Sequence, residues 1–143
     1  DFCLSRGLGD VYKRQVDKTL SEVRVTDYDA LVLPGGQINP DTLRADPKVV
    51  SFVREFFNSK KPLAAICHAP WLLIEADVVR GRDITSYNSI KTDVKNAGGN
   101  WLDQEVVVHE ALITSRNPGD IPAFVAKIIE EVEEGRHEDR KVA

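Results

Sequence analysis

The chain has 143 residues, of which 42% are hydrophobic and 29% charged, and its formal net charge is -4 at pH 7. This length and apolar content predict one domain that buries its own core. The mild negative charge, without a basic stripe, argues against nucleic acid as a partner, and no apolar run is long enough to span a membrane. Because the long apolar stretch of a signal peptide is absent too, the expected location is the cytoplasm.

The first 15 residues differ from the rest because they show the periodicity of neither a strand nor a helix. Their second half, GLGDVYKRQ, resembles translated sequencing-adapter read-through. We therefore interpret residues 1–15 as a non-native leader on a truncated gene. The domain itself is expected over residues 16–134, and residues 135–143 are expected to form a polar, disordered tail.

From residue 16 onward, apolar runs with strand and helix periodicity alternate along the chain. A first strand is expected over residues 30–33, ended by a Pro-Gly-Gly turn, and a loop follows through residues 39–41. Pro47 opens a helix that ends within residues 58–61. The next strand, over residues 63–66, leads directly into another helix.

The second half of the chain continues this alternation. It predicts an extended segment over 84–87, a short helix over 90–97, a hairpin of 104–109 and 111–114, and a last helix running through Val132. Alternating strands and helices predict a parallel sheet covered on both faces, with functional groups at the carboxyl ends of the strands. Two solvent-exposed features are also expected, namely the Arg80 and Arg82 side chains and the end of the last helix over 130–140.

Cys67 lies where the apolar run 63–66 changes into a helical pattern. A cysteine on such a turn has its sulfur beside a helix N-terminus, where the helix dipole and unpaired N–H groups favour a thiolate. The neighbouring His68, and Pro70 in the first helical turn, are typical of a nucleophile elbow. The alternative is that Cys67 is a small buried hydrophobic residue, which is the usual role of a free cysteine.

The Gly35-Gly36 turn ends the strand that precedes the cysteine strand in the sequence. Backbone N–H groups of a glycine-rich turn beside a nucleophile can stabilise a developing oxyanion. The alternative is a tight turn with no chemical role. No metal site is expected, because the two cysteines and three histidines fit no zinc-binding spacing.

The order and spacing of several motifs resemble the ThiJ/PfpI superfamily, in particular its PfpI-type branch of intracellular proteases and deglycases. The similarity extends from about residue 16 to about residue 132, through DYDALVLPGG, NPDTLR, AICHAP, GR, TSY, KTD, NAG and TSRNP. It implies a flavodoxin-like α/β fold, with a parallel sheet sandwiched by helices as in class I glutamine amidotransferases. The first strand, first helix and second strand of the family have no counterpart in this sequence.

The resemblance also implies roles for individual residues. Cys67 and His68 would form the catalytic pair, and Asp41 of a neighbouring subunit would complete a triad. The alternative for Asp41 is an ordinary turn or helix-capping aspartate. The family's first-loop acidic residue, which hydrogen-bonds the cysteine sulfur, has no counterpart in this sequence.

The remaining expected site residues surround that pair. The resemblance implies an oxyanion hole made by the backbone N–H groups of Gly36 and His68, and a cleft lined by Gly35 and Tyr87. For Tyr87 the alternative is a core or interface position. Catalysis would need no cofactor and no metal, and a homo-oligomer, either a dimer or a trimer of dimers, is implied.

These residues are compatible with three alternative functions. One is a stress-response glyoxalase or deglycase that acts on a small aldehyde or a glycated adduct, and another is an intracellular cysteine protease that acts on peptides. The third is a redox sensor or stress chaperone in which Cys67 oxidises reversibly. Glutamine amidotransferase activity is disfavoured because His109-Glu110 has the wrong spacing for the His-x-Glu of that class.

Overall fold

A computed structural model describes residues 2–6, 11–135, 137 and 141–142. Parts of the predicted leader (residues 1 and 7–10) and of the predicted tail (136, 138–140 and 143) therefore lie outside the described residues. In the described part of the chain, no helix has both the length and the apolar character needed to cross a membrane.

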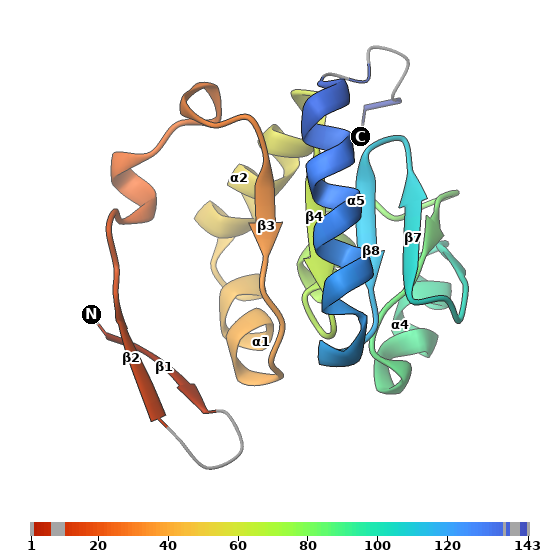
Figure 1. Cartoon of the computed structure of the whole chain (residues 1–143), viewed down its shortest axis with the longest axis horizontal. Coiled ribbons are helices and arrows are strands. Elements are labelled where there is room, and N and C mark those ends of the chain that lie inside the picture. Colours follow the sequence, from red (N-terminus) through yellow and green to blue (C-terminus); the bar gives the residue numbers. More distant parts are fainter. Residues whose placement is uncertain (1, 7–10, 136, 138–140, 143) are drawn as a thin grey trace.

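The central sheet has four strands in the order β3-β4-β8-β7 (Figure 1). Its strands β3, β4 and β8 are parallel, and β7 runs antiparallel to β8. Leu63 of β4 lies opposite Leu31 of β3 on one side and Leu112 of β8 on the other. These strands are β3 (Leu31–Leu33), β4 (Leu63–Ile66), β7 (Val106–His109) and β8 (Leu112–Ser115).

Helices cover both faces of this sheet, as alternation predicted (Figure 1). On one face, buried residues of α2 and α3, such as Phe57 and Leu72, form the main core together with Leu63. On the other face, Phe124 of α5 packs with Ala64 and Ile113. The helices are α1 (Ile38–Arg44), α2 (Pro47–Asn58), α3 (Pro70–Glu75), α4 (Lys91–Asn96) and α5 (Ile121–Glu134). The flavodoxin-like α/β fold is thus confirmed.

Four short 3-10 helices connect these elements: η1 (Leu20–Glu22), η2 (Val25–Asp27), η3 (Asn88–Ile90) and η4 (Pro118–Asp120). A parallel pair, β5 (Asp83–Ile84) and β6 (Asn100–Trp101), flanks α4 and was not predicted from the sequence. The predicted extended segment 84–87 is correspondingly shorter as a strand. The hairpin was predicted correctly, and its tip residues Glu110 and Ala111 have positive φ values of 51 and 60.

Two expectations about local structure are wrong. Residues 39–41 belong to α1 and not to a loop, because Pro40 stands in the first turn, where a missing N–H costs nothing, and Asp41 pairs with Arg44 one turn later. The leader, expected to lack strand structure, forms the antiparallel pair β1 (Phe2–Arg6) and β2 (Val11–Gln15), which stands apart from the central sheet (Figure 1).

Arg82 was expected to be exposed and is instead 8% exposed. Its guanidinium packs over the Phe57 ring at 4.7 Å and donates hydrogen bonds to the carbonyl oxygens of Val78 and Lys141. Arg80 points to solvent as expected, with 71% of its side chain exposed. The two arginines therefore do not act as a pair: among the described residues Arg82 contacts carbonyl oxygens and an aromatic ring, whereas Arg80 lies 3.9 Å from Asp77 Oδ1.

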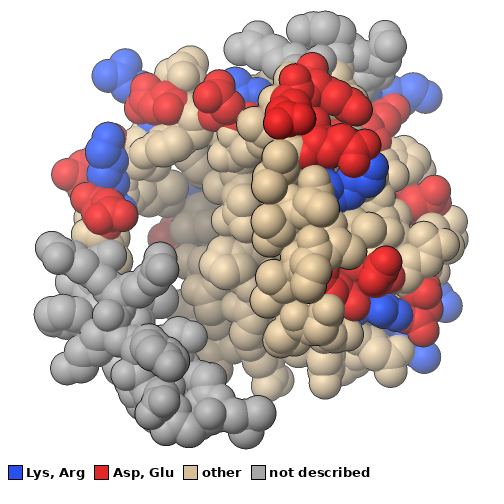
Figure 2. Space-filling view, viewed as in Figure 1, with Lys and Arg blue, Asp and Glu red and all other residues tan. Residues whose placement is uncertain are grey.

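The end of α5 also differs from the expected solvated surface. Glu131 is only 5% exposed, and its Oε2 atom lies 3.0 Å from Nε2 of His137. The His137 backbone N–H donates to the Lys60 carbonyl oxygen at 3.1 Å. Figure 2 shows acidic side chains gathered near this end of the helix, and an uncharged surface along the rest of it. The described tail residues His137 and Lys141 thus contact the domain.

Candidate active site

Cys67 follows β4 directly and has a φ of 65, a left-handed conformation that is rare for a residue with a side chain. Two hydrogen bonds hold it there. Its N–H donates to the Ser115 carbonyl oxygen at 3.0 Å, and its own carbonyl oxygen accepts the Tyr87 N–H at 2.8 Å. The residue is half-buried. Strain of this kind, fixed by neighbouring strands, is typical of functional turns, and it disfavours the reading of Cys67 as simple core.

Gly35 lies against this turn so closely that no side chain fits. An added Cβ atom would stand 2.6 Å from Cβ of Cys67 and 2.8 Å from the Ile66 carbonyl oxygen. Gly36 has a different requirement, since its φ is 80 and an added Cβ would meet nothing within 4 Å. The two glycines therefore serve separate needs, close approach at Gly35 and backbone conformation at Gly36.

His68 turns its ring back toward the cysteine. Its Nδ1 atom lies 3.2 Å from the Cys67 sulfur, and its Nε2 atom lies 3.1 Å from Oγ of Ser89. The residue is 8% exposed, and burial lowers the pKa of the imidazole because the charged form loses hydration. The ring therefore favours its neutral form, which can accept a proton from a thiol.

Two aromatic rings fix the plane of the His68 ring. Tyr87 stacks on it with ring centroids 4.8 Å apart, and Trp71 meets it at 5.2 Å. The Trp71 indole N–H donates to Asp93 Oδ2 at 2.8 Å. Tyr87 is 42% exposed, so it is not a core residue. It lies beside His68, and its expected role in a substrate cleft stays a prediction.

The backbone N–H groups of Gly36 and His68 were the expected oxyanion hole. Within the described part of the chain, neither N–H donates a hydrogen bond. The residue before Gly36 lies against the cysteine, since an added Gly35 Cβ would lie 3.5 Å from the Cys67 sulfur. Donors left unpaired beside a nucleophile are suited to a developing negative charge.

Asp41 does not reach this cluster within its own chain. Its Oδ1 accepts two hydrogen bonds from Arg44, at 2.8 and 3.1 Å, and its side chain is 58% exposed. Arg44 in turn lies over the Trp71 ring at 4.4 Å. The expected catalytic role of Asp41 in a neighbouring subunit stays a prediction.

Sequence reasoning did not find Ser89, which holds the second nitrogen of His68. The two residues are 21 positions apart, and an exposed serine after Tyr87 carries no signal by itself. What places it is the backbone: Tyr87 is tied to the Cys67 carbonyl oxygen, and Ile90 is buried with its N–H on the Tyr87 carbonyl oxygen. Ser89 sits between these two anchors on η3.

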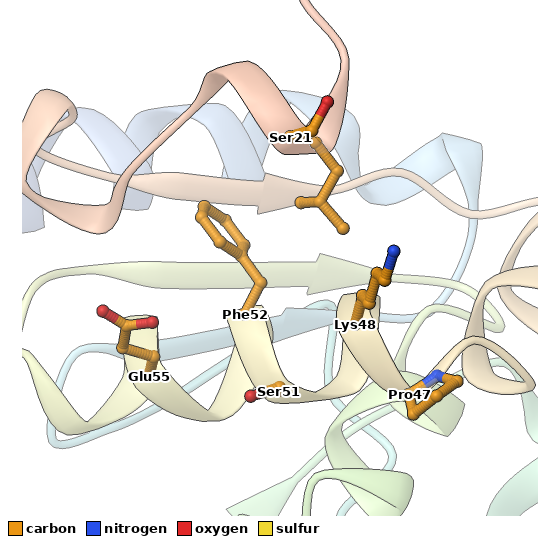
Figure 3. Close-up of a pocket in the computed structure, with 7 residues that line it drawn as sticks. Ser21, Pro47, Lys48, Ser51, Phe52 and Glu55 are labelled. Carbon is orange, nitrogen blue, oxygen red and sulfur yellow. The ribbon is translucent and has the colours of Figure 1, made fainter.

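Among the described residues, one group brings three possible metal ligands within 4.8 Å of one another: Glu131, Glu134 and His137. It lies at the end of α5, at the opposite end of the sheet from Cys67 (Figure 1). Two surface hollows also lie away from Cys67. One is formed between η1 and α2, where the Phe52 ring and Lys48 face Ser21 (Figure 3), and the other adjoins Arg44 and Arg54.

The fold and this cluster define an α/β protein with a cysteine on a strained strand-to-helix turn. Residues 4–131 match the DJ-1/PfpI family, and the chain belongs to that family. The superfamily predicted from the motifs is thus confirmed.

Known relatives support the same placement. The chain is 56% identical over 110 residues to the Escherichia coli (strain K12) protein named protein/nucleic acid deglycase 2, covering 76% of this chain and 63% of the relative. It is 49% identical over 112 residues to YraA of Bacillus subtilis (strain 168), named as a candidate cysteine protease, covering 78% and 66%. A solved two-domain protein of Anabaena variabilis, with DJ-1/ThiJ/PfpI-like and ferritin-like domains, matches with a TM-score of 0.82 and 39% identity, over 92% of this chain and 38% of that one. The chain thus spans less than two thirds of the length of these two curated relatives.

Proposed function

We propose that the protein acts on reactive carbonyl compounds, either small aldehydes or glycated adducts, with Cys67 as its nucleophile. This proposal rests on the position of the Cys67 sulfur, which lies on a strained turn 3.2 Å from Nδ1 of His68. The His68 ring is buried, and burial lowers its pKa and favours the neutral form. The deglycase name of a relative that is 56% identical supports the same chemistry. Removal of such compounds also fits the stress response predicted from the family resemblance.

The first step uses the cysteine and the histidine together. His68 Nδ1 takes the proton of the Cys67 thiol, and the sulfur adds to the carbonyl carbon of the substrate. A carbon–sulfur bond forms as the carbon–oxygen π bond breaks, which leaves negative charge on oxygen. The N–H groups of Gly36 and His68 stabilise that oxygen, and the proton held by His68 then neutralises it.

A dicarbonyl substrate allows the reaction to finish without a cofactor. In the adduct, a proton moves from the carbon that bears sulfur to the neighbouring carbonyl carbon, with His68 as the base, while that carbonyl becomes a hydroxyl-bearing carbon. The product is a thioester of Cys67. Water hydrolyses it to a hydroxy acid and regenerates the thiol, so the electrons balance within the substrate.

A homo-oligomer is part of the proposal, because Asp41 is exposed on α1 and does not meet His68 in its own chain. In such an assembly, Asp41 of one subunit would orient His68 of the next. Mixing Cys67→Ala subunits with Asp41→Ala subunits under exchange conditions should then restore activity in part, since some sites regain both residues. Activity that stays absent after proven subunit exchange would remove this role from Asp41.

Peptide hydrolysis is the second candidate. Tyr87 and Ser89, which lie beside the cysteine turn, are both exposed, and an extended peptide would need an exposed approach of this kind. The name of the relative YraA points to the same activity. An acyl-enzyme mechanism benefits from a carboxylate that orients the histidine, and Asp41 of a neighbouring subunit would supply it. Within the described residues of one chain, Nε2 of His68 contacts the Ser89 hydroxyl instead.

The deciding experiment measures turnover of methylglyoxal and of a fluorogenic peptide by the protein and by Cys67→Ser. Cys3→Ser is the matched control, because it alters the other cysteine of the chain. We expect methylglyoxal loss that disappears only in Cys67→Ser. Peptide cleavage alone, dependent on Cys67, would replace the proposal with the protease, and inactivity on both substrates would shift it to the redox sensor or chaperone.

A further inference from the structure

At the end of α5, two side chains place buried polar atoms side by side without a hydrogen bond between them. Oε2 of Glu131 lies 3.0 Å from Nε2 of His137. Both atoms are buried, and neither has a hydrogen-bond partner among the described residues. The Glu131 side chain is only 7% exposed, so its oxygen is shielded from bulk water as well. Buried polar atoms in this state call for a third group that binds both of them.

A second carboxylate completes the group. Glu134 lies three residues after Glu131, and its Oε2 atom is 3.9 Å from Nε2 of His137. One ligand atom from each of the three residues lies within 4.8 Å of the other two. Residues three apart on a helix are neighbours, which puts both carboxylates on one side of α5. The Glu134 side chain is 57% exposed, so packing does not prevent it from turning toward the other two.

The backbone after α5 holds His137 against the helix. The helix ends at Gly135, whose φ of 86 is a conformation that favours glycine. Beyond it, the His137 N–H donates to the Lys60 carbonyl oxygen at 3.1 Å. Lys60 follows α2, so the histidine is tied to a segment distant in sequence. The three side chains therefore come from one helix and from a residue fixed beside it by its own backbone.

The distances and the donor types fit a divalent transition-metal ion. Zinc binds histidine nitrogen and carboxylate oxygen at about 2.0–2.2 Å, so two such ligands at roughly 90–110° are separated by about 2.8–3.6 Å. The 3.0 Å between Glu131 and His137 lies within that range. Calcium and magnesium prefer oxygen ligands, whereas an imidazole nitrogen suits zinc. Burial raises the pKa of the Glu131 carboxyl, and a bound cation would favour its charged form again.

We propose that Glu131, Glu134 and His137 form a site for a divalent transition-metal ion such as zinc, which fastens the segment after α5 to the body of the domain. The site lies at the opposite end of the sheet from Cys67, so it is structural and does not depend on the proposed function (Figure 1). The acidic side chains gathered on this surface also attract cations (Figure 2). The expectation of no metal site considered only cysteine and histidine spacing, whereas two of these three ligands are carboxylates.

Zinc binding in competition with a chromogenic chelator tests the site. Both cysteines, Cys3 and Cys67, are first alkylated with iodoacetamide, which removes the competing thiolate ligands. The protein should then bind one zinc ion. Glu131→Gln and His137→Gln should each weaken binding by about a hundredfold, because even partners outside the ligand shell are worth roughly 10- to 100-fold. Glu134→Gln should weaken it less, since water can replace an exposed ligand.

Two control variants remove the same kinds of group elsewhere. Glu133→Gln neutralises an exposed neighbour on α5, and His109→Gln removes a histidine whose Nδ1 lies 3.8 Å from Asp83 Oδ2. Both should bind zinc as the parent does. Zinc should also raise the urea midpoint of the parent and slow hydrogen exchange of the His137 amide, relative to the same protein in EDTA. Neither change should occur in Glu131→Gln.

Near-UV circular dichroism without zinc checks that each variant keeps its fold. A parent that binds no zinc would overturn the inference, as would one zinc ion bound equally by the parent, Glu131→Gln and His137→Gln. If Glu133→Gln weakened binding as much as Glu131→Gln, general negative charge would account for the affinity, and the proposed ligand set would be wrong.

Discussion

The two ends of the central sheet each hold a histidine, and the partners of the two rings differ. At the carboxyl end, His68 lies between the Cys67 sulfur and the Ser89 hydroxyl. At the other end, His137 lies 3.0 Å from Oε2 of Glu131 and 3.9 Å from Oε2 of Glu134. His68 therefore lies between a thiol and a hydroxyl, whereas His137 faces two carboxylates.

This difference shows how an imidazole is suited to different roles. A carboxylate partner stabilises the charged ring and fixes it as half of an ion pair. A hydroxyl partner is uncharged and lacks this electrostatic stabilisation. At the carboxyl end the nearby carboxylates are bound by arginines instead, Asp41 by Arg44 and Asp120 by Arg116. Within one chain, neither of these two carboxylates hydrogen-bonds His68 in the described residues.

The largest effect should come from breaking the turn at Gly35. Gly35→Ala places a Cβ atom 2.6 Å from Cβ of Cys67, so the sulfur must move. A displacement of about 1 Å costs on the order of a hundredfold in rate, and overpacking of this kind costs about 1–3 kcal/mol of stability. Iodoacetamide alkylation of Cys67 and urea unfolding measure the two effects.

Gly81→Ala is the control for Gly35. Gly81 also has a positive φ, of 73, but an added Cβ there meets nothing within 4 Å. It should lose stability by about 1–2 kcal/mol with no change in Cys67 reactivity. Equal reactivity in the two variants would show that close approach at Gly35 does not position the nucleophile.

A smaller loss of stability is expected when the Asp120 carboxylate, which pairs with Arg116, is replaced by a neutral amide. Asp120 is 5% exposed and accepts hydrogen bonds from the Arg116 side chain, which lower the pKa of its carboxyl. Asp120→Asn should destabilise the protein by about 1–3 kcal/mol at neutral pH in urea unfolding.

The stability lost in Asp120→Asn should depend on pH in a definite direction. A lowered native-state pKa contributes stability above about pH 4, and that contribution is lost as the pH falls through the native value. The gap between Asp120→Asn and the parent should therefore narrow on acidification. Asp103→Asn is the control, since Asp103 also binds Arg116 but is 70% exposed and should matter far less. A gap that widens in acid would contradict this account.

The smallest effect is expected at the far end, from Glu131→Gln. Burial raises the pKa of the Glu131 carboxyl, opposed by His137. Stability from a raised pKa is present below about pH 4 and declines as the pH rises through the native value. Gln has no such decline, so the variant should exceed the parent near pH 8 by less than about 1 kcal/mol.

Urea unfolding near pH 4 and pH 8 checks this, with Glu134→Gln as control because that side chain is 57% exposed. A variant less stable than its parent at the higher pH would mean that the ion pair with His137 outweighs the cost of burial. The carboxylate beside His137 would then contribute net stability to the folded protein.

Much of the fold could be predicted because its signals are local. The apolar run of β4, the helix-opening Pro47 and the hairpin tip at His109-Glu110 each depend on neighbouring residues. Arg82 was misplaced because its burial depends on Phe57 and on the Lys141 carbonyl oxygen, which are distant in sequence. The pairing of β5 with β6 likewise has no local signal, since each strand has only two residues.

The candidate site divides in the same way. The contact between Cys67 and His68 joins adjacent residues, so the motif at the end of β4 could indicate it. The close approach of Gly35 and the reach of Ser89 required the folded chain, because parallel strands bring their carboxyl ends together from distant positions. A serine in an exposed turn gives no sign of the ring that it holds.

The strand that carries the nucleophile is hydrogen-bonded to a neighbour on each side. β4 lies between β3 and β8, so its amides are shielded from water by backbone partners on two edges as well as by helices on two faces. In hydrogen–deuterium exchange, the amides of Leu63–Ile66 should be among the slowest to exchange, and those of η3 among the faster ones. The Cys67 sulfur would then follow the strand whose backbone hydrogen bonds open most rarely. The backbone of η3, which carries Ser89 beside His68, would open far more often.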